Sequence, residues 1–209
     1  MASRPTATSF ALLGLLGLQP WTAYDLVAQT RRSLNNFWPR SEAHVYAELK
    51  RLVERGHADA EVIDGRRGQR TRYTITPGGR AALQDWLGSE PAAPRIEVEA
   101  LLRLLFADQG TIEDLRAVVE TTASQAREMR ARSLVLGEEL LETGGPFPSR
   151  LHLTERVVAL YGEFVLLLVR WCEETSAEIE TWSGADNIGL TPRGRERLEQ
   201  LLSGARQTP

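Results

Sequence analysis

The segment 61–80 is rich in arginine and contains the residues whose chemistry is easiest to interpret. It holds five arginines against Glu61 and Asp64, a local net charge of +3. The planar guanidinium fork of arginine fits phosphate oxygens and guanine edges, so the segment suits contact with nucleic acid. A solvated charged face is the commoner explanation of such a cluster. The position of these arginines in the fold must therefore decide between the two.

The charge of the chain is unevenly distributed. Residues 1–90 contain 12 basic and 9 acidic residues, whereas residues 91–209 contain 13 basic and 19 acidic ones. The first part is therefore basic and the second acidic, although the net charge of all 209 residues is only −3. Gly and Pro are frequent in 88–94, and we predict two domains, 1–90 and 91–209, that meet there.

Other kinds of chemistry find little support. The sequence has no glycine-rich phosphate loop, no His-Glu metal pair and no nucleophile elbow. The three histidines are scattered, and the single cysteine, Cys172, lies in an apolar run where burial would make it inert. The acidic pairs 138–139 and 173–174 fit the wet face of a helix. We therefore expect no enzymatic activity, no catalytic residue, no metal site and no cofactor.

Localisation follows from similar reasoning. No apolar run reaches the roughly 18–20 residues that a membrane-spanning helix needs, and one cysteine cannot form an intrachain disulfide. The apolar stretch 9–18, with Arg4 before it, is like the core of a short signal peptide. It ends at 19–22 without a small-residue cleavage site, which favours a buried first helix. We expect a cytoplasmic protein that does not interact with membranes.

The first 90 residues are expected to form short helices and a hairpin. Thr22, Ser41 and Thr76 are good N-caps, and Pro77 suits a first helical position. Asp64-Gly65 is typical of a hairpin turn. The predicted elements are helices at 12–18, 22–30, 41–55 and 76–87, with strands at 58–63 and 70–75. Three helices, a hairpin with a basic tip and a linking helix make the pattern of a winged helix-turn-helix.

The second part is expected to be helical, which makes the fold mainly α. Helices are predicted at about 96–107, 115–140, 149–182 and 192–203. The centre of the third, 164–172, is apolar on nearly every side, and one antiparallel neighbour cannot cover such a helix. We therefore predict a homodimer whose contacts come from two helical stripes: Leu136, Leu140, Tyr161, Phe164, Leu168 and Trp171.

Several short pieces of the chain match one family: 11–16 (ALLGLL), 23–26 (AYDL), 37–39 (FWP), 45–52 (VYAELKRL), 65–80 (GRRGQRTRYTITPGGR), Leu83 and 86–87 (WL). Together they resemble the PadR family of transcriptional regulators. The matching pieces occur in family order over about 9–87, and the ordered set is more specific than any one piece. Ala47 stands where the family often has proline, and Glu42 or Ala43 where a glycine is common.

The resemblance implies a dimeric repressor that binds a double-stranded DNA operator. The helix at 41–55 would enter the major groove, and the hairpin would reach the minor groove or the adjacent backbone. The candidate base contacts are Ser41, His44 and Tyr46, with Arg40 and Lys50 on phosphates and Arg66, Arg67, Gln69 and Arg70 at the wing. Ser41 can instead be a plain cap, His44 an exposed polar residue and Tyr46 a side chain packed beneath the helix.

The family's usual trigger is a small effector, for which planar hydrophobic ligands are typical. Phe164 and Trp171, on one face of the second long helix, are the candidate lining. Two alternatives remain open at this stage. A winged helix can act as a protein-interaction module instead of binding DNA, and a different class of winged-helix regulator can share this kind of head.

Overall fold

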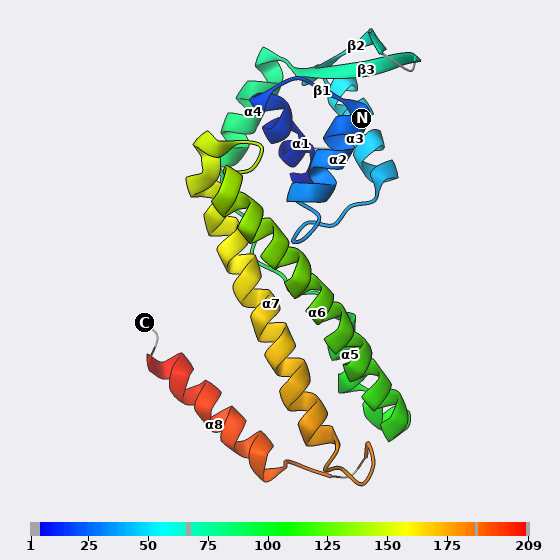
Figure 1. Cartoon of the computed structure of the whole chain (residues 1–209), viewed down its shortest axis with the longest axis vertical. Helices are drawn as coiled ribbons and strands as arrows, with labels where there is room; N and C mark the ends of the chain where they lie inside the picture. The colour runs from blue at the N-terminus through cyan, green and yellow to red at the C-terminus, as the bar shows by residue number, and fades with distance from the viewer. Residues whose placement is uncertain (1–4, 66–67, 187, 208–209) are drawn as a thin grey trace. The chain divides into compact units, whose positions relative to one another are not determined.

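The computed structural model describes residues 5–65, 68–186 and 188–207 (Figure 1). The chain divides into two compact units, Met1–Pro94 and Arg95–Pro209. Each unit is considered by itself below. Within the described ranges, no helix is long and apolar enough to cross a membrane.

Three helices build the core of the first unit. They are α1 (Ala7–Leu18), α2 (Ala23–Ser33) and α3 (Glu42–Glu54). Thr22 and Ser41 cap α2 and α3 as predicted, each accepting a hydrogen bond from the backbone N–H three residues on. The first helix starts earlier than predicted, because Thr6 and Ser9 form a reciprocal capping box. The core is formed by Leu12, Leu13, Leu16, Leu26, Leu49 and Leu52, each 0–1% exposed.

A three-stranded antiparallel sheet lies beside these helices, in the order β1-β3-β2. Strands β2 (Ala58–Gly65) and β3 (Gly68–Ile75) form the predicted hairpin, which is longer than expected because pairing continues to Gly65 opposite Gly68. The two-residue strand β1 (Trp21–Thr22) was not predicted. It pairs Trp21 with Tyr73, and the indole Nε1 of Trp21 donates to the Leu15 carbonyl at 2.9 Å.

Helix α4 (Pro77–Leu87) follows the sheet and begins as predicted, with Thr76 as N-cap and Pro77 as first residue. It packs on α1, where the rings of Phe10 and Trp86 stack with centroids 4.9 Å apart. A Cβ atom at Gly79 would lie 2.1 Å from the His57 carbonyl oxygen. Only glycine therefore fits this close approach between α4 and the start of β2.

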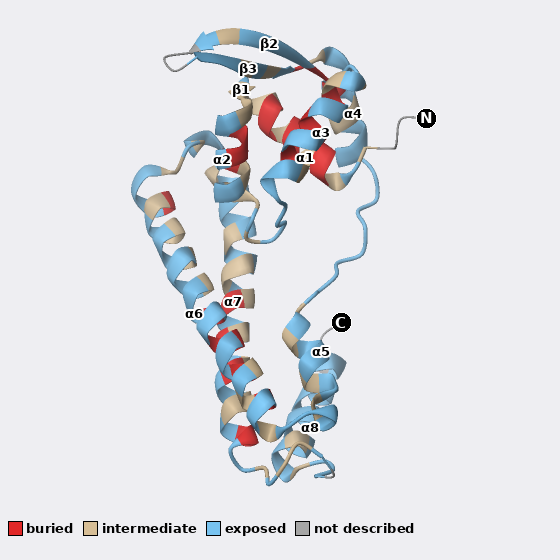
Figure 2. Ribbon diagram, turned by 90° about the vertical axis from the view of Figure 1, so that its right-hand side faces the viewer, coloured by how far each residue is buried: buried red, intermediate tan, exposed pale blue. Residues whose placement is uncertain are grey.

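The second unit is an antiparallel pair of long helices with two shorter ones. Its elements are α5 (Glu99–Leu105), α6 (Ile112–Thr143), α7 (Leu151–Ile179) and α8 (Pro192–Gln207), with 3-10 turns η1 (Ala107–Gln109) and η2 (Pro148–Arg150). Helix α6 is capped at its C-terminus by Gly144, which has a φ of +72° and lies between the helices predicted at 115–140 and 149–182. Figure 2 shows buried positions along the facing sides of α6 and α7, and Val165, Val169 and Cys172 form the buried side of α7. The predicted fold class, mainly α with a winged helix-turn-helix head, is confirmed.

Candidate nucleic-acid interface

Helix α3 presents one exposed face, opposite the side that packs in the core. Tyr46, Ala47 and Lys50 are exposed, whereas Val45, Leu49 and Leu52 are buried. Tyr46 is 42% exposed and so is not packed beneath the helix. The pKa of Tyr73 on strand β3 is raised mainly by burial and, to a smaller extent, by the nearby Tyr46. This face can therefore be presented to the groove of a nucleic acid.

The N-terminal end of α3 is ordered by its own side chains. The Ser41 hydroxyl accepts a hydrogen bond from the His44 backbone N–H at 3.3 Å, so Ser41 is a cap. His44 itself is half-buried. Glu42 pairs with Arg31 of α2 at 3.1 Å. The residues predicted to meet base edges are thus brought together in the first turn and a half of one helix.

Arg40 lies just before this turn and is held against the protein. Its guanidinium carbon is 4.7 Å from the centre of the Trp38 ring, and Nη1 donates to the Pro39 carbonyl at 2.6 Å. Thr8 Oγ1 accepts from the Trp38 indole at 3.2 Å and from Arg40 Nε at 3.4 Å. A phosphate contact by Arg40 would use the donors that remain on its exposed side.

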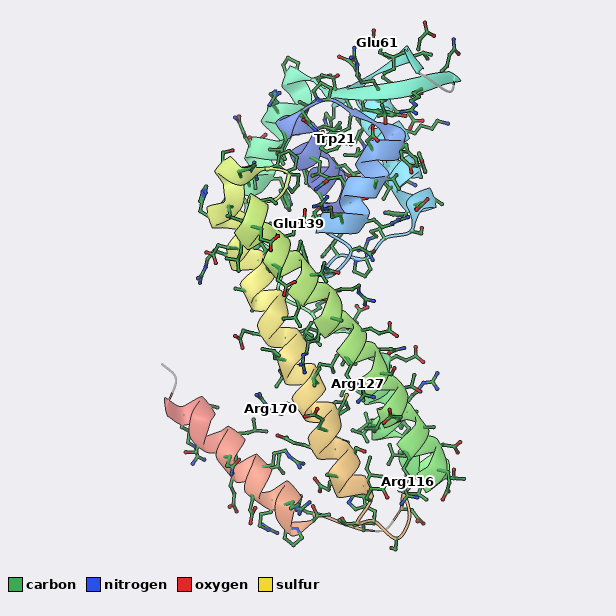
Figure 3. All side chains as sticks on the ribbon, viewed as in Figure 1. Trp21, Glu61, Arg116, Arg127, Glu139 and Arg170 are labelled. Atoms are coloured by element: carbon green, nitrogen blue, oxygen red, sulfur yellow. The ribbon has the colours of Figure 1, made fainter. Side chains whose placement is uncertain are left out.

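The hairpin of β2 and β3, which we call the wing, carries charges of both signs on one face. Strand alternation places Asp59 and Glu61 on the same face as Arg70 and Arg72, because Glu61 pairs with Arg72 and Ile63 with Arg70. Arg72 Nη2 lies 2.7 Å from Glu61 Oε2, and Figure 3 labels Glu61 on the hairpin. Gln69 and Arg70 are exposed near the tip. The predicted contacts Arg66 and Arg67 lie outside the described residues.

A buried carboxylate supports α3 from behind, and the sequence alone did not reveal it. Glu48 is 0% exposed. It accepts a hydrogen bond from the Ser9 hydroxyl of α1 and is paired with Arg51 at 2.7 Å and Arg55 at 3.3 Å. Burial raises the pKa of Glu48, but the hydrogen bonds from Ser9, Arg51 and Arg55 together outweigh it, and the pKa lies below the ordinary value. The signal was a glutamate on the apolar face of one helix and a serine in the apolar run of another.

The predicted dimer contacts lie along α6 and α7 with different degrees of burial. Tyr161, Phe164, Leu168 and Trp171 are half-buried along one side of α7, and Leu136 of α6 is also half-buried. Leu140 is only 8% exposed, so its side chain is already covered within the protomer. Leu160 and Leu167 are 75% and 52% exposed. Helix α6 therefore covers one side of α7 and leaves further apolar surface on the others.

Three comparisons place this geometry among known proteins. Residues 12–85 match the model of the transcriptional regulator PadR-like family. The negative transcriptional regulator PadR of Bacillus subtilis is 30% identical over 99 residues, which are 46% of this chain and 54% of that protein. The match therefore spans about half the length of this relative.

Solved structures share the fold over most of the chain. Bacillus subtilis PadR in complex with operator DNA has a TM-score of 0.69 and 23% identity, covering 83% of this chain and 99% of that one. The same protein with p-coumaric acid has a TM-score of 0.63 and 21% identity, covering 84% of this chain and 99% of that one. The PadR-like regulator BC1756 of Bacillus cereus has a TM-score of 0.71 and 18% identity, covering 86% and 99%.

Proposed function

Because this chain belongs to the PadR-like family of transcriptional regulators, we propose that it binds a specific DNA operator as a homodimer and thereby represses transcription. The observation that carries the proposal is the exposed face of α3 beside a wing whose outer face bears Arg70 and Arg72. The acidic surface of the second unit is unsuited to DNA. We infer that the first unit, which we call the head, makes all the contacts with the operator.

In this proposal α3 enters the major groove. Tyr46 and His44 face base edges, while Lys50 and Arg40 hold phosphates and so fix the register. Backbone N–H groups at the start of α3 add favourable dipoles for a phosphate. Gln69 and Arg70, with Arg66 and Arg67, approach the minor groove or its sugar-phosphate edges, where a narrow groove attracts arginine.

Dimerisation supplies the second half-site. The apolar surface of α7 that α6 does not fully cover, which includes the half-buried Phe164 and Trp171, is the contact surface that we assign to a second copy. A two-fold dimer presents two copies of α3 to successive turns of one DNA face, so the operator is expected to be an inverted repeat. Catalysis plays no part in this function, and we place the protein in the cytoplasm.

Regulation by a small effector completes the proposal. One structural relative has been solved with p-coumaric acid, a planar phenolic ligand. We propose a ligand of the same planar, hydrophobic class for this chain, with Phe164 and Trp171 as the candidate lining. A ligand of this kind shifts the dimer between two spacings of the wings only if its affinity for the two states differs.

The test is a gel-shift titration at two salt concentrations, with DNA from upstream of the protein's own gene. We expect a discrete complex that survives non-specific competitor and weakens steeply with salt, because several phosphates are neutralised. Tyr46→Ala should relax sequence preference. The double variant Arg66→Ala/Arg67→Ala should lower affinity for all sequences and reduce the salt slope. Arg156→Ala, on an arginine of α7 whose side chain is 80% exposed, is the control for the loss of an arginine in the second unit and should leave binding unchanged.

A protein-interaction module is the second candidate function, favoured by the acidic charge of residues 91–209. It predicts no shift with any promoter fragment at low salt. Capture of a basic protein partner by the second unit would then replace the operator proposal. A shift that is equally strong with unrelated DNA would reject sequence specificity but leave DNA binding in place.

A further inference from the structure

Helix α8 is an amphipathic helix with its apolar side uncovered. Leu198, Leu201 and Leu202 share one side and are 50%, 64% and 56% exposed. The helix carries four arginines and two glutamates, a net charge of +2, and Arg195 and Arg206 both border the leucines on the side of Leu202. Figure 2 shows α8 almost wholly exposed. An apolar side with a basic border needs an apolar partner with an acidic border.

The start of α8 is fixed to the end of α7 by a buried carboxylate. Glu178 is 6% exposed and accepts hydrogen bonds from Thr191 Oγ1 at 2.6 Å and from Arg197 Nη2 at 2.5 Å. Thr191 also caps α8 by accepting from the Gly194 N–H at 2.9 Å. These hydrogen bonds lower the pKa of Glu178. The first turn of α8 is therefore anchored, while its leucines extend beyond the anchor.

A matching surface lies near the end of α6. Leu134, Val135 and Leu141 are 56%, 65% and 88% exposed and share one face of the helix with Glu138 and Glu142. We call these five residues the receiving face. The sequence from 133 to 149 contains no lysine or arginine. The receiving face is thus apolar and acidic, and it complements the basic, apolar side of α8.

Within one protomer α8 is too short to reach this face. Val119 packs in one cluster with Ile179 and so marks the position of the anchor on α6. Leu134 and Leu141 lie 15 and 22 residues further along α6, which is about 22–33 Å at 1.5 Å per residue. The leucines of α8 lie only 7–11 residues from Thr191, or about 10–17 Å. Figure 3 shows Arg116 and Glu139 near opposite ends of α6.

We propose that α8 docks on the receiving face of a second copy of this chain. An antiparallel arrangement of two α6–α7 hairpins brings the anchor of one copy beside the end of α6 in the other. Two-fold symmetry then makes the contact twice, with each copy giving an α8 and accepting one. The inference rests on the homodimer of the proposed function and identifies a contact within it.

Cross-linking between two single-cysteine proteins tests the docking directly. In a Cys172→Ala background, Leu141→Cys protein is mixed with Leu201→Cys protein and oxidised gently. We expect more disulfide-linked dimer on a non-reducing gel from the mixture than from either protein oxidised alone, because only the mixture can join residue 141 to residue 201. Glu120→Cys, on the exposed side of α6 near the anchor, is the matched control with Leu201→Cys, and this mixture should give no such increase.

Charge exchange provides an independent measurement with the same chain. Arg195→Glu/Arg206→Glu and Glu138→Arg/Glu142→Arg should each weaken the homodimer by about tenfold in sedimentation, because symmetry doubles the loss of each exposed ion pair. A mixture of the two variants should form a heterodimer that is stronger than either homodimer. All substituted side chains are exposed, so far-UV circular dichroism should be unchanged.

The outcomes separate this inference from the function it rests on. Dimers that form without the Leu141–Leu201 cross-link, and with an affinity insensitive to the charge exchange, would overturn the docking and leave the homodimer intact. Folding of α8 onto its own α7 would give that result. A chain that sediments as a monomer at all concentrations would reject both the homodimer and the docking.

Discussion

The hydroxyl of Ser9 on α1 donates a hydrogen bond to the carboxylate of Glu48 on α3. The two residues are 39 positions apart in the chain, and the contact is buried. Arg51 and Arg55 hold the same carboxylate from within α3 and its C-cap. Helix α3, which we assign to the major groove, is thus held against α1 by a buried hydrogen bond to a charged carboxylate, in addition to the packing of its leucines.

Replacing the carboxylate should destabilise the head. Glu48→Gln keeps the shape of the side chain but removes the buried negative charge that pairs with Arg51 and with Arg55, whose side chain is only 10% exposed. We expect the free energy of unfolding to fall by about 2–4 kcal/mol, measured by urea denaturation. Glu54→Gln, on the exposed side of the same helix, should change stability by less than about 0.5 kcal/mol. Equal losses in the two variants would contradict a special role for Glu48.

Stability should fall when the solution is made acidic. Glu48 and Glu178 have pKa values below the ordinary 4.5 in the folded chain, so the unfolded chain binds protons that the folded chain does not. Their stabilising contribution is complete above pH 4.5 and is lost as the pH falls through the folded pKa values. Urea denaturation at about pH 5 and about pH 3 measures this slope. Glu48→Gln should flatten it, and an unchanged slope would show that Glu48 does not contribute.

Two neighbouring glycines of α4 should respond oppositely to the same substitution. A Cβ at Gly79 would meet the His57 carbonyl oxygen at 2.1 Å, whereas at Gly78 its nearest neighbours are at 3.7 Å. We expect Gly79→Ala to lower the free energy of unfolding by about 2 kcal/mol or more. Gly78→Ala should be neutral or stabilise by up to about 1 kcal/mol, because alanine favours the helix. Thermal denaturation of both variants decides, and tolerance of alanine at 79 would be inconsistent with the close packing of α4 on β2.

The acidic residues of the wing should oppose DNA binding. Glu61 holds Arg72 at 2.7 Å on the face that also carries Arg70. Glu61→Gln removes a negative charge and releases Arg72, so affinity for DNA should rise by about two- to tenfold, with a steeper salt dependence. Asp85→Asn, an exposed substitution on α4 with the same charge change, is the control in the gel-shift titration. Weaker binding by Glu61→Gln would mean that the Glu61–Arg72 pair orients the wing for DNA.

Local signals in the sequence predicted most of the elements, because helix starts are determined within a few residues. Thr22, Ser41 and Thr76 each cap the helix predicted from them. The strand β1 was missed, since two residues carry no period and their pairing partner is Tyr73. Helix 149–182 was predicted a few residues too long at both ends, and the last helix too short.

The sequence predicted the candidate site less completely than it predicted the fold. The exposure of Tyr46 and Lys50 depends on how α3 packs on α1, which involves Ser9 and Glu48 from distant positions. The ion pair between Glu61 and Arg72 depends on the strand register, which a longer hairpin than expected determines. The predicted roles of these residues in DNA binding remain predictions until the variants are measured.

The short strand β1 also constrains the order in which the chain can assemble. Trp21 pairs with Tyr73, so the head cannot complete its sheet during synthesis until β3 has left the ribosome. The α6–α7 hairpin closes over a turn of a few residues, and a local contact of this kind forms faster than a distant one. We expect α1 and α2 to reach their native packing only after the wing has formed. A substitution that weakens β3 should therefore slow the folding of the helices that precede it.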